Sequence, residues 1–131
     1  MMNKSRQTEN LGEISRSFAE DQVFKYLLRN SNLTRKQAET LIYDLVTSQG
    51  VKLSAREKAS LRGVSKGAFM RTRQQANRNI RKALHTLLLL SYLGIMRLPS
   101  YDWFFQLGEA AEEKDAEKLR SMLEDLSGVM R

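Results

Sequence analysis

The sequence predicts an all-α fold, a compact helical domain of about six helices with one long central helix. Apolar residues recur at helical spacing behind polar capping residues. Proline occurs once, at Pro99, and no segment alternates apolar and polar residues as a strand does. The length of 131 residues suits one domain with its own core. We therefore expect residues 1–131 to form a single helical domain.

Capping-box patterns predict where the first helices begin, because a hydroxyl and a carboxylate or amide three residues later can satisfy free N–H groups. Apolar stripes follow the first two patterns, and Gly50 ends the second helix. The three patterns are Ser17-x-x-Glu20, Thr34-x-x-Gln37 and Ser54-x-x-Glu57.

Residues 53–82 read LSAREKASLRGVSKGAFMRTRQQANRNIRK. A short helix ends near Arg62, and Gly63 supplies a turn because glycine adopts positive φ without strain. Ser65 then caps a second helix, with Val64 and Phe69 placed to pin it to the core. This order of short helix, tight turn and second helix predicts a helix-turn-helix at 53–82.

Nothing breaks the second helix until Gly94. Its expected buried line is Phe69, Thr72, Ala76, Ile80, Ala83 and Leu87. Residues 83–96 are apolar on nearly all sides of the helix, but the segment is too short to span a bilayer. A surface helix needs only one apolar face, so this segment has more apolar surface than packing on one side would bury. We expect part of this segment to pack on the N-terminal helices and on a helix that begins near Trp103. The rest is expected to form a homodimer interface at Leu84, Leu88, Leu89 and Tyr92, with a fully buried central helix in a monomer as the alternative.

Residues 99–131 predict two further helices, the second capped by Asp115. This segment carries eight acidic and four basic residues. We expect its acidic helices to stay off a polyanion and to be able to contact transcription machinery.

The net charge of +7 is unevenly distributed, since residues 52–82 carry ten basic residues and one acidic residue. Such a block indicates a polyanionic partner, although a solvated basic surface is the alternative. Zero cysteines and one histidine argue against thiolate catalysis and Cys or His metal clusters. No phosphate loop or nucleophile elbow is present, so we expect no enzyme activity, no metal and no cofactor.

The segment 53–82 resembles region four of bacterial sigma factors. The shared residues are Leu53, Ser54, Glu57, Ala59, Gly63, Val64, Ser65, Gly67, Ala76, Ile80 and Arg81, with Phe69 in place of valine. The run QANRNIRKALHTL (75–87) is similar to archaeal Tfx-type regulators. The resemblance covers residues 34–87 and implies a DNA-binding transcription regulator. Lys58, Arg62 and Arg73 depart from it, because the family pattern has apolar residues there.

The polar face of the second helix provides the candidate DNA contacts. Lys66, Arg71 and Gln74 are expected to read base edges, because Arg or Lys can bond guanine and Gln can bond adenine. Met70 is placed for a thymine methyl group. The expected phosphate contacts are Arg56, Lys58, Arg73, Gln75, Arg78, Arg81 and Lys82.

Other functions remain open on the sequence alone. The same basic block could bind structured RNA, or the helix-turn-helix could serve as a protein adaptor. The polar start MMNKSRQTEN lacks the apolar stretch of a signal peptide. We therefore expect a cytoplasmic protein with no membrane partner, binding double-stranded DNA as a homodimer.

Overall fold

The computed structural model describes residues 13, 16–48, 53–96 and 101–125. These residues are almost entirely helical and contain no β-strand, which confirms the all-α prediction. Residues 16–20 form a short helical segment. The longer helices are α2 (Gln22–Asn30), α3 (Arg35–Ser48), α4 (Ala55–Arg62), α5 (Lys66–Tyr92), α6 (Tyr101–Glu112) and α7 (Ala116–Glu124).

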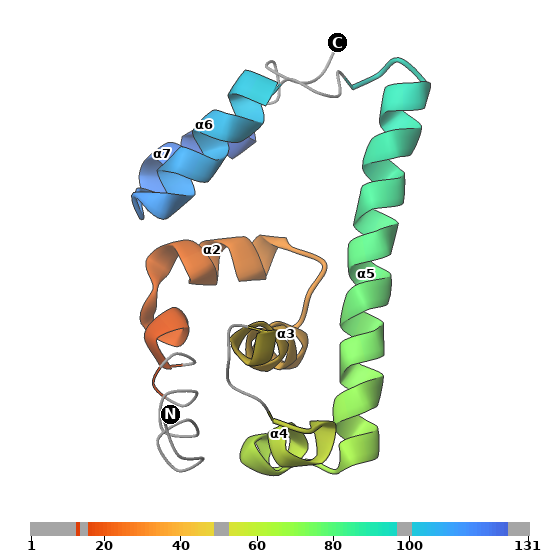
Figure 1. The fold of residues 1–131 in the computed structure, drawn as a ribbon. Helices are drawn as coiled ribbons and strands as arrows, with labels where there is room; N and C mark the ends of the chain where they lie inside the picture. The colour runs from red at the N-terminus through yellow and green to blue at the C-terminus, as the bar shows by residue number, and fades with distance from the viewer. Residues whose placement is uncertain (1–12, 14–15, 49–52, 97–100, 126–131) are drawn as a thin grey trace.

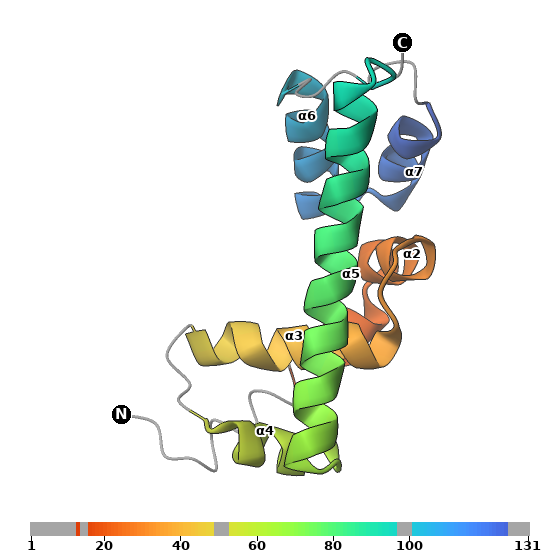
Figure 2. The same cartoon turned by 90° about the vertical axis from the view of Figure 1, so that its right-hand side faces the viewer.

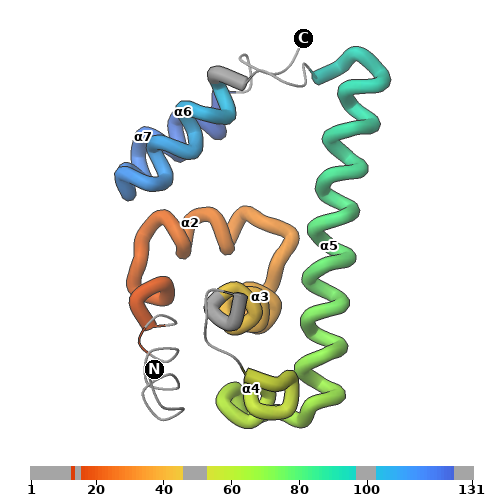
Figure 3. The backbone as a smooth tube through the Cα atoms, in the orientation of Figure 1, coloured from red at the N-terminus to blue at the C-terminus, as the bar shows by residue number. Residues whose placement is uncertain are grey.

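Helix α5 is the long central helix that the sequence predicts, with 27 residues and a length of about 40 Å. Its N-terminal half packs on α3 and α4, while α6 packs on α7 and α7 contacts α2. Figures 1 and 2 show α3 and α4 beside the first half of α5, and the α6–α7 pair at the level of its second half. The tube in Figure 3 traces the same path, with α2 between these two groups of helices.

Most helices begin at the predicted capping residue. Thr34 and Gln37 exchange side-chain to backbone hydrogen bonds of 3.0 and 3.2 Å. The capping box of Ser54 is also present, and the Asp115 carboxylate accepts from the Lys118 N–H at 3.0 Å. Predicted Gly50 and Pro99 boundaries lie outside the described residues.

The predicted cap at Ser17 is wrong. Ser17 lies inside the helical segment 16–20, and Asp21 caps α2 instead. The Asp21 carboxylate accepts from the N–H groups of Val23 and Phe24 at 2.8 and 3.2 Å. A charged acceptor that satisfies two free N–H groups stabilises this start more than one serine hydroxyl could.

Two small cores share helix α2. Val23 of α2 packs with Ala110 and Leu119 from the C-terminal helices. Its neighbour Phe24 packs against a second core that includes Phe69 of α5. Because adjacent residues of one helix enter different cores, α2 joins the α6–α7 pair to the helix-turn-helix.

The C-terminal half of α5 packs less than the sequence predicts. Ala83 and Leu87 are half-buried, but Leu84, Leu88 and Leu89 are 54%, 62% and 55% exposed. The expected packing of this segment on the Trp103 helix is therefore wrong, because α6 packs on α7 rather than on α5. Ile80, expected in the buried line, is also exposed. No helix among the described residues is long and apolar enough to cross a membrane.

Asp21 makes the stability of α2 dependent on pH. Burial raises the pKa of its carboxyl. Hydrogen bonds from the Phe24 and Val23 N–H groups, together with the Lys114 ammonium 3.3 Å away, lower the pKa by more than burial raises it. The net pKa therefore lies below the ordinary value. A carboxyl with a depressed folded-state pKa stabilises the fold above its unfolded pKa of about 3.9, and this contribution is lost as pH falls.

We predict that Asp21→Asn, which keeps a capping side chain but removes the charge beside Lys114, lowers the free energy of unfolding at pH 7 by about 0.5 kcal/mol, with a smaller difference from wild type at pH 3. Urea unfolding followed by circular dichroism at several pH values measures both. Glu20→Gln is the control, since Glu20 is exposed. An equal Asp21→Asn deficit at both pH values would contradict this role.

Candidate nucleic-acid interface

The turn between α4 and α5 has the geometry that the sequence predicts. Gly63 is left-handed, with φ 71°, and its N–H donates to the Ser60 carbonyl at 3.0 Å. The Ser65 hydroxyl accepts from the Ala68 N–H at 3.1 Å and caps α5. No neighbouring atom lies near the position of a Cβ at Gly63, so backbone conformation rather than crowding requires glycine there.

A small apolar core lies where α3, α4 and α5 meet. Ala59 and Phe69 are 1% exposed and Ala76 is fully buried. Ala59 and Phe69 pack with Ile42, Tyr43 and Leu53. Phe69 therefore anchors α5 as predicted. Val64, the expected second anchor, is 40% exposed.

Two carboxylates of α3 hold three cations of the helix-turn-helix. The Asp44 Oδ1 atom lies 2.8 Å from the Lys58 ammonium and 3.7 Å from the Arg73 guanidinium. Glu39, on the same helix as Asp44, pairs with Arg62 of α4. These are the three cations that stand where the sigma-factor pattern has apolar residues. Ion pairs thus contribute to the contact between α3 and the α4–α5 segment.

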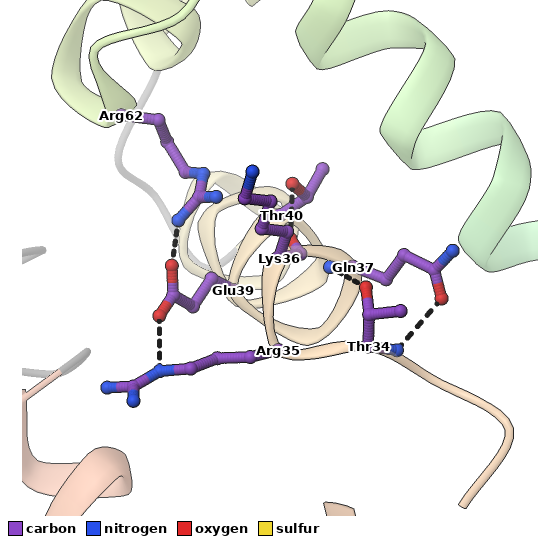
Figure 4. A network of polar contacts seen from close by, with 7 residues as sticks. All are labelled: Thr34, Arg35, Lys36, Gln37, Glu39, Thr40 and Arg62. Carbon is purple, nitrogen blue, oxygen red and sulfur yellow. Dashed lines mark hydrogen bonds and ion pairs between the residues drawn. The ribbon is translucent and has the colours of Figure 1, made fainter.

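Figure 4 shows how the Glu39 pair is built. One oxygen of Glu39 faces Arg62 of α4, and the other lies 3.1 Å from the Nε atom of Arg35 on α3. The Arg62 guanidinium also lies over the Tyr43 ring, 5.9 Å from its centroid. Arg62 is therefore held against α3 by charge and by its planar face.

These pairs involve two of the expected phosphate contacts, Lys58 and Arg73. The Lys58 side chain is 9% exposed, and that of Arg73 is 30% exposed. Asp44 supplies the counter-charge that the nearly buried Lys58 ammonium needs. Arg73 lies near the same carboxylate but keeps part of its side chain in solvent. Lys58 and Arg73 are therefore less available to a phosphate group than the exposed cations of this segment.

Met70 is half-buried, with its sulfur 3.1 Å from an Arg73 nitrogen. The side chain lies at the edge of the exposed face of α5. It is therefore less accessible to a thymine methyl group than the sequence predicts.

The remaining predicted contacts are exposed. At 100° per residue, Arg71, Gln74 and Arg78 lie on the face of α5 opposite Phe69. Gln74, Arg78 and Arg81 line a shallow surface hollow of about 350 Å³. Within the described part of segment 53–82, the exposed cations are Arg56, Lys66, Arg71, Arg78, Arg81 and Lys82, and Gln74 and Gln75 are exposed beside them.

Sequence reasoning missed the residues that hold this face in place. Asn79 donates to the Asn32 carbonyl at 3.0 Å and to the Gln37 side chain at 3.2 Å, and so ties α5 to the start of α3. Glu39 and Asp44 were also missed. The sequence did contain a signal for these two carboxylates. Three cations stand at positions where the compared pattern has apolar residues, and a buried cation needs a carboxylate on a neighbouring helix.

Comparison with known proteins gave no matching family model, and no curated protein or solved structure matched the chain.

We predict that Asp44→Ala lowers the free energy of unfolding by about 3 kcal/mol, because it leaves the buried Lys58 ammonium without its partner. Lys58→Met should cost less, since Asp44 is partly exposed and keeps Arg73. Urea unfolding measures both effects.

Lys58→Met should also leave the affinity for duplex DNA unchanged, as fluorescence anisotropy would show. Weakened binding by a stably folded Lys58→Met variant would return Lys58 to the DNA interface.

Proposed function

We propose that this chain binds double-stranded DNA sequence-specifically as a transcription regulator, with the N-terminal half of α5 in the major groove. The observation that carries the proposal is the division of the cations in segment 53–82. Lys58, Arg62 and Arg73 are neutralised by α3, and the other described cations face solvent. An exposed cationic surface on a helix-turn-helix suits the phosphate backbone of a duplex.

The positions of the exposed side chains suggest their roles. Lys66, Arg71 and Gln74 lie in the first turns of α5, where a recognition helix meets base edges. Arg and Lys suit guanine, and Gln suits adenine. The residues proposed to hold the phosphate backbone are Arg56, Gln75, Arg78, Arg81 and Lys82.

The rest of the chain suits assembly better than DNA contact. The exposed leucines in the second half of α5 favour a homodimer, and two motifs would together supply more affinity than one. Helices α6 and α7 and the turn between them carry Glu109, Glu112, Glu113 and Glu117. We propose that these helices face away from the duplex and contact transcription machinery. This function would be performed in the cytoplasm.

The structure gives little support to an RNA-binding alternative. RNA-binding proteins commonly stack exposed aromatic side chains on unpaired bases. Phe69 is the one aromatic residue in segment 53–82, and it is 1% exposed. The same basic surface can therefore contact a phosphate backbone but has no aromatic platform for bases.

We predict a steep salt dependence of binding to a short duplex that carries one site. If the exposed cations contact about six phosphates, log K should fall against log salt concentration with a slope of about −5. Arg78→Gln should reduce that slope by about 1. Fluorescence anisotropy between low and physiological salt measures both.

Arg29→Gln is the matched control for the salt experiment. Arg29 is an exposed cation of α2, outside the proposed interface. It should leave the slope unchanged. A flat salt response of the wild-type protein, or equal effects of the two substitutions, would refute direct DNA binding by this face.

Gly67 provides a second test, because its space is open and the fold does not need a glycine there. The nearest atom to a Cβ at Gly67 would be the Arg71 Nη1, at 3.9 Å, and Gly108 of α6 has no atom within 4 Å. Alanine at either position should raise the free energy of unfolding, by up to about 1 kcal/mol, since glycine disfavours helix.

Only Gly67→Ala should weaken duplex binding, because Gly67 lies where the phosphate backbone would approach the start of α5. Thermal unfolding and anisotropy of both variants test this. Equal DNA affinity of Gly67→Ala and Gly108→Ala would show that the duplex does not approach the start of α5 closely.

A further inference from the structure

The second half of α5 carries a ridge of exposed side chains spaced four residues apart. Leu84, Leu88 and Tyr92 are 54%, 62% and 88% exposed. Residues with this spacing form a continuous row on a helix, and two such rows interlock when helices cross at about −50°. A ridge this apolar on a surface helix indicates a partner.

A groove lies next to the start of this ridge. It measures about 400 Å³ and is lined by Leu33, Ile80, Ala83, Leu84 and Leu87 among its apolar residues, while Asn32 and Asn79 lie on its polar side. A cavity with apolar walls and a polar edge suits a tyrosine, which has an apolar ring and one polar tip. Tyr92, the most exposed of the large apolar residues described, is such a side chain.

The charges along α5 favour one direction of pairing. Residues 83–96 contain no Lys, Arg, Asp or Glu, whereas Arg78, Arg81 and Lys82 come directly before them. Two parallel copies of α5 in register would bring these cations close to their own copies. Two antiparallel copies that overlap only in the uncharged half would place the cations at opposite ends, where repulsion is weaker.

We propose that the ridge binds a second copy of this chain, with the two α5 helices antiparallel and crossing at Leu88. In this arrangement Leu88 meets Leu88 of the partner subunit, and position 92 of each copy meets position 84 of the other. The Tyr92 ring then enters the groove beside Leu84. The interface is self-complementary, as a twofold dimer requires. The inference rests on the dimeric form of the proposed regulator and specifies its geometry.

Leu89, also expected at the dimer interface, does not belong to this ridge. It lies 100° around the helix from Leu88 and borders a hollow with Arg78, Arg81 and Lys82.

Because the two helices are proposed to cross at Leu88, Leu88→Gln should convert the dimer to a monomer. Leu89→Gln, at a residue of similar exposure, should leave the dimer mass unchanged.

The chain contains no cysteine, so single introduced cysteines can be cross-linked without background. The full chain is treated with a short bis-maleimide as Leu84→Cys alone, Tyr92→Cys alone, Leu88→Cys alone, and an equal mixture of the first two. The antiparallel dimer predicts efficient cross-linking of Leu88→Cys and of the mixture. It predicts little cross-linking of Leu84→Cys or Tyr92→Cys alone.

Efficient cross-linking of Leu84→Cys alone and of Tyr92→Cys alone would establish parallel pairing and overturn the proposal. A monomeric mass for the wild-type chain, with no cross-linking of any variant, would overturn it as well. Duplex binding of the same samples is measured separately by anisotropy. A failed interface with intact DNA binding would leave the proposed function standing, and the reverse result would reject DNA binding while keeping the dimer.

Discussion

The ion pairs between α3 and the helix-turn-helix determine both how the motif packs and which charges remain for a ligand. Lys58 and Arg73 converge on Asp44, and Arg62 meets Glu39. Their desolvation is offset only while both carboxylates are in place. The pairs therefore join α3 to α4 and α5 beside a small apolar core, and at the same time they give three cations of the segment a carboxylate partner within the chain. What remains outside is a face led by Lys66, Arg71 and Gln74.

Helix α5 combines two different surfaces along one rigid element. Its first half is pinned by Phe69 and Ala76 and presents polar and basic side chains to solvent. Its second half lacks charge and exposes Leu88 and Tyr92. Because α5 is one continuous helix, its two halves keep a fixed position relative to each other. A second copy bound at the second half would therefore fix the distance between the basic first halves of the two copies. DNA recognition and assembly are thereby proposed to depend on the same helix.

Features set by local backbone chemistry were predictable from the sequence. Ser54 and Ser65 cap their helices, and Gly63 adopts positive φ, because each depends on neighbours within a few residues. The prediction of a cap at Ser17 was wrong because Asp21, four residues later, is the stronger acceptor. A cation at position 58 indicated that a carboxylate partner was needed, but which carboxylate it meets depends on how α3 crosses α4, and the sequence pattern does not define that crossing. The sequence therefore predicted which segment carries the candidate site. It did not distinguish the cations that face solvent from those that pair with α3.

The most direct test of this account is the response of individual arginine side chains to duplex DNA. Nitrogen-detected NMR resolves the Nε–H groups, and the duplex is added at low salt. The account predicts that the Nε–H signals of Arg71, Arg78 and Arg81 shift and return to their free positions at high salt. Those of Arg62 and Arg73 should stay unchanged. Equal shifts of all five, or no shift of the first three, would contradict the division between structural and DNA-facing cations.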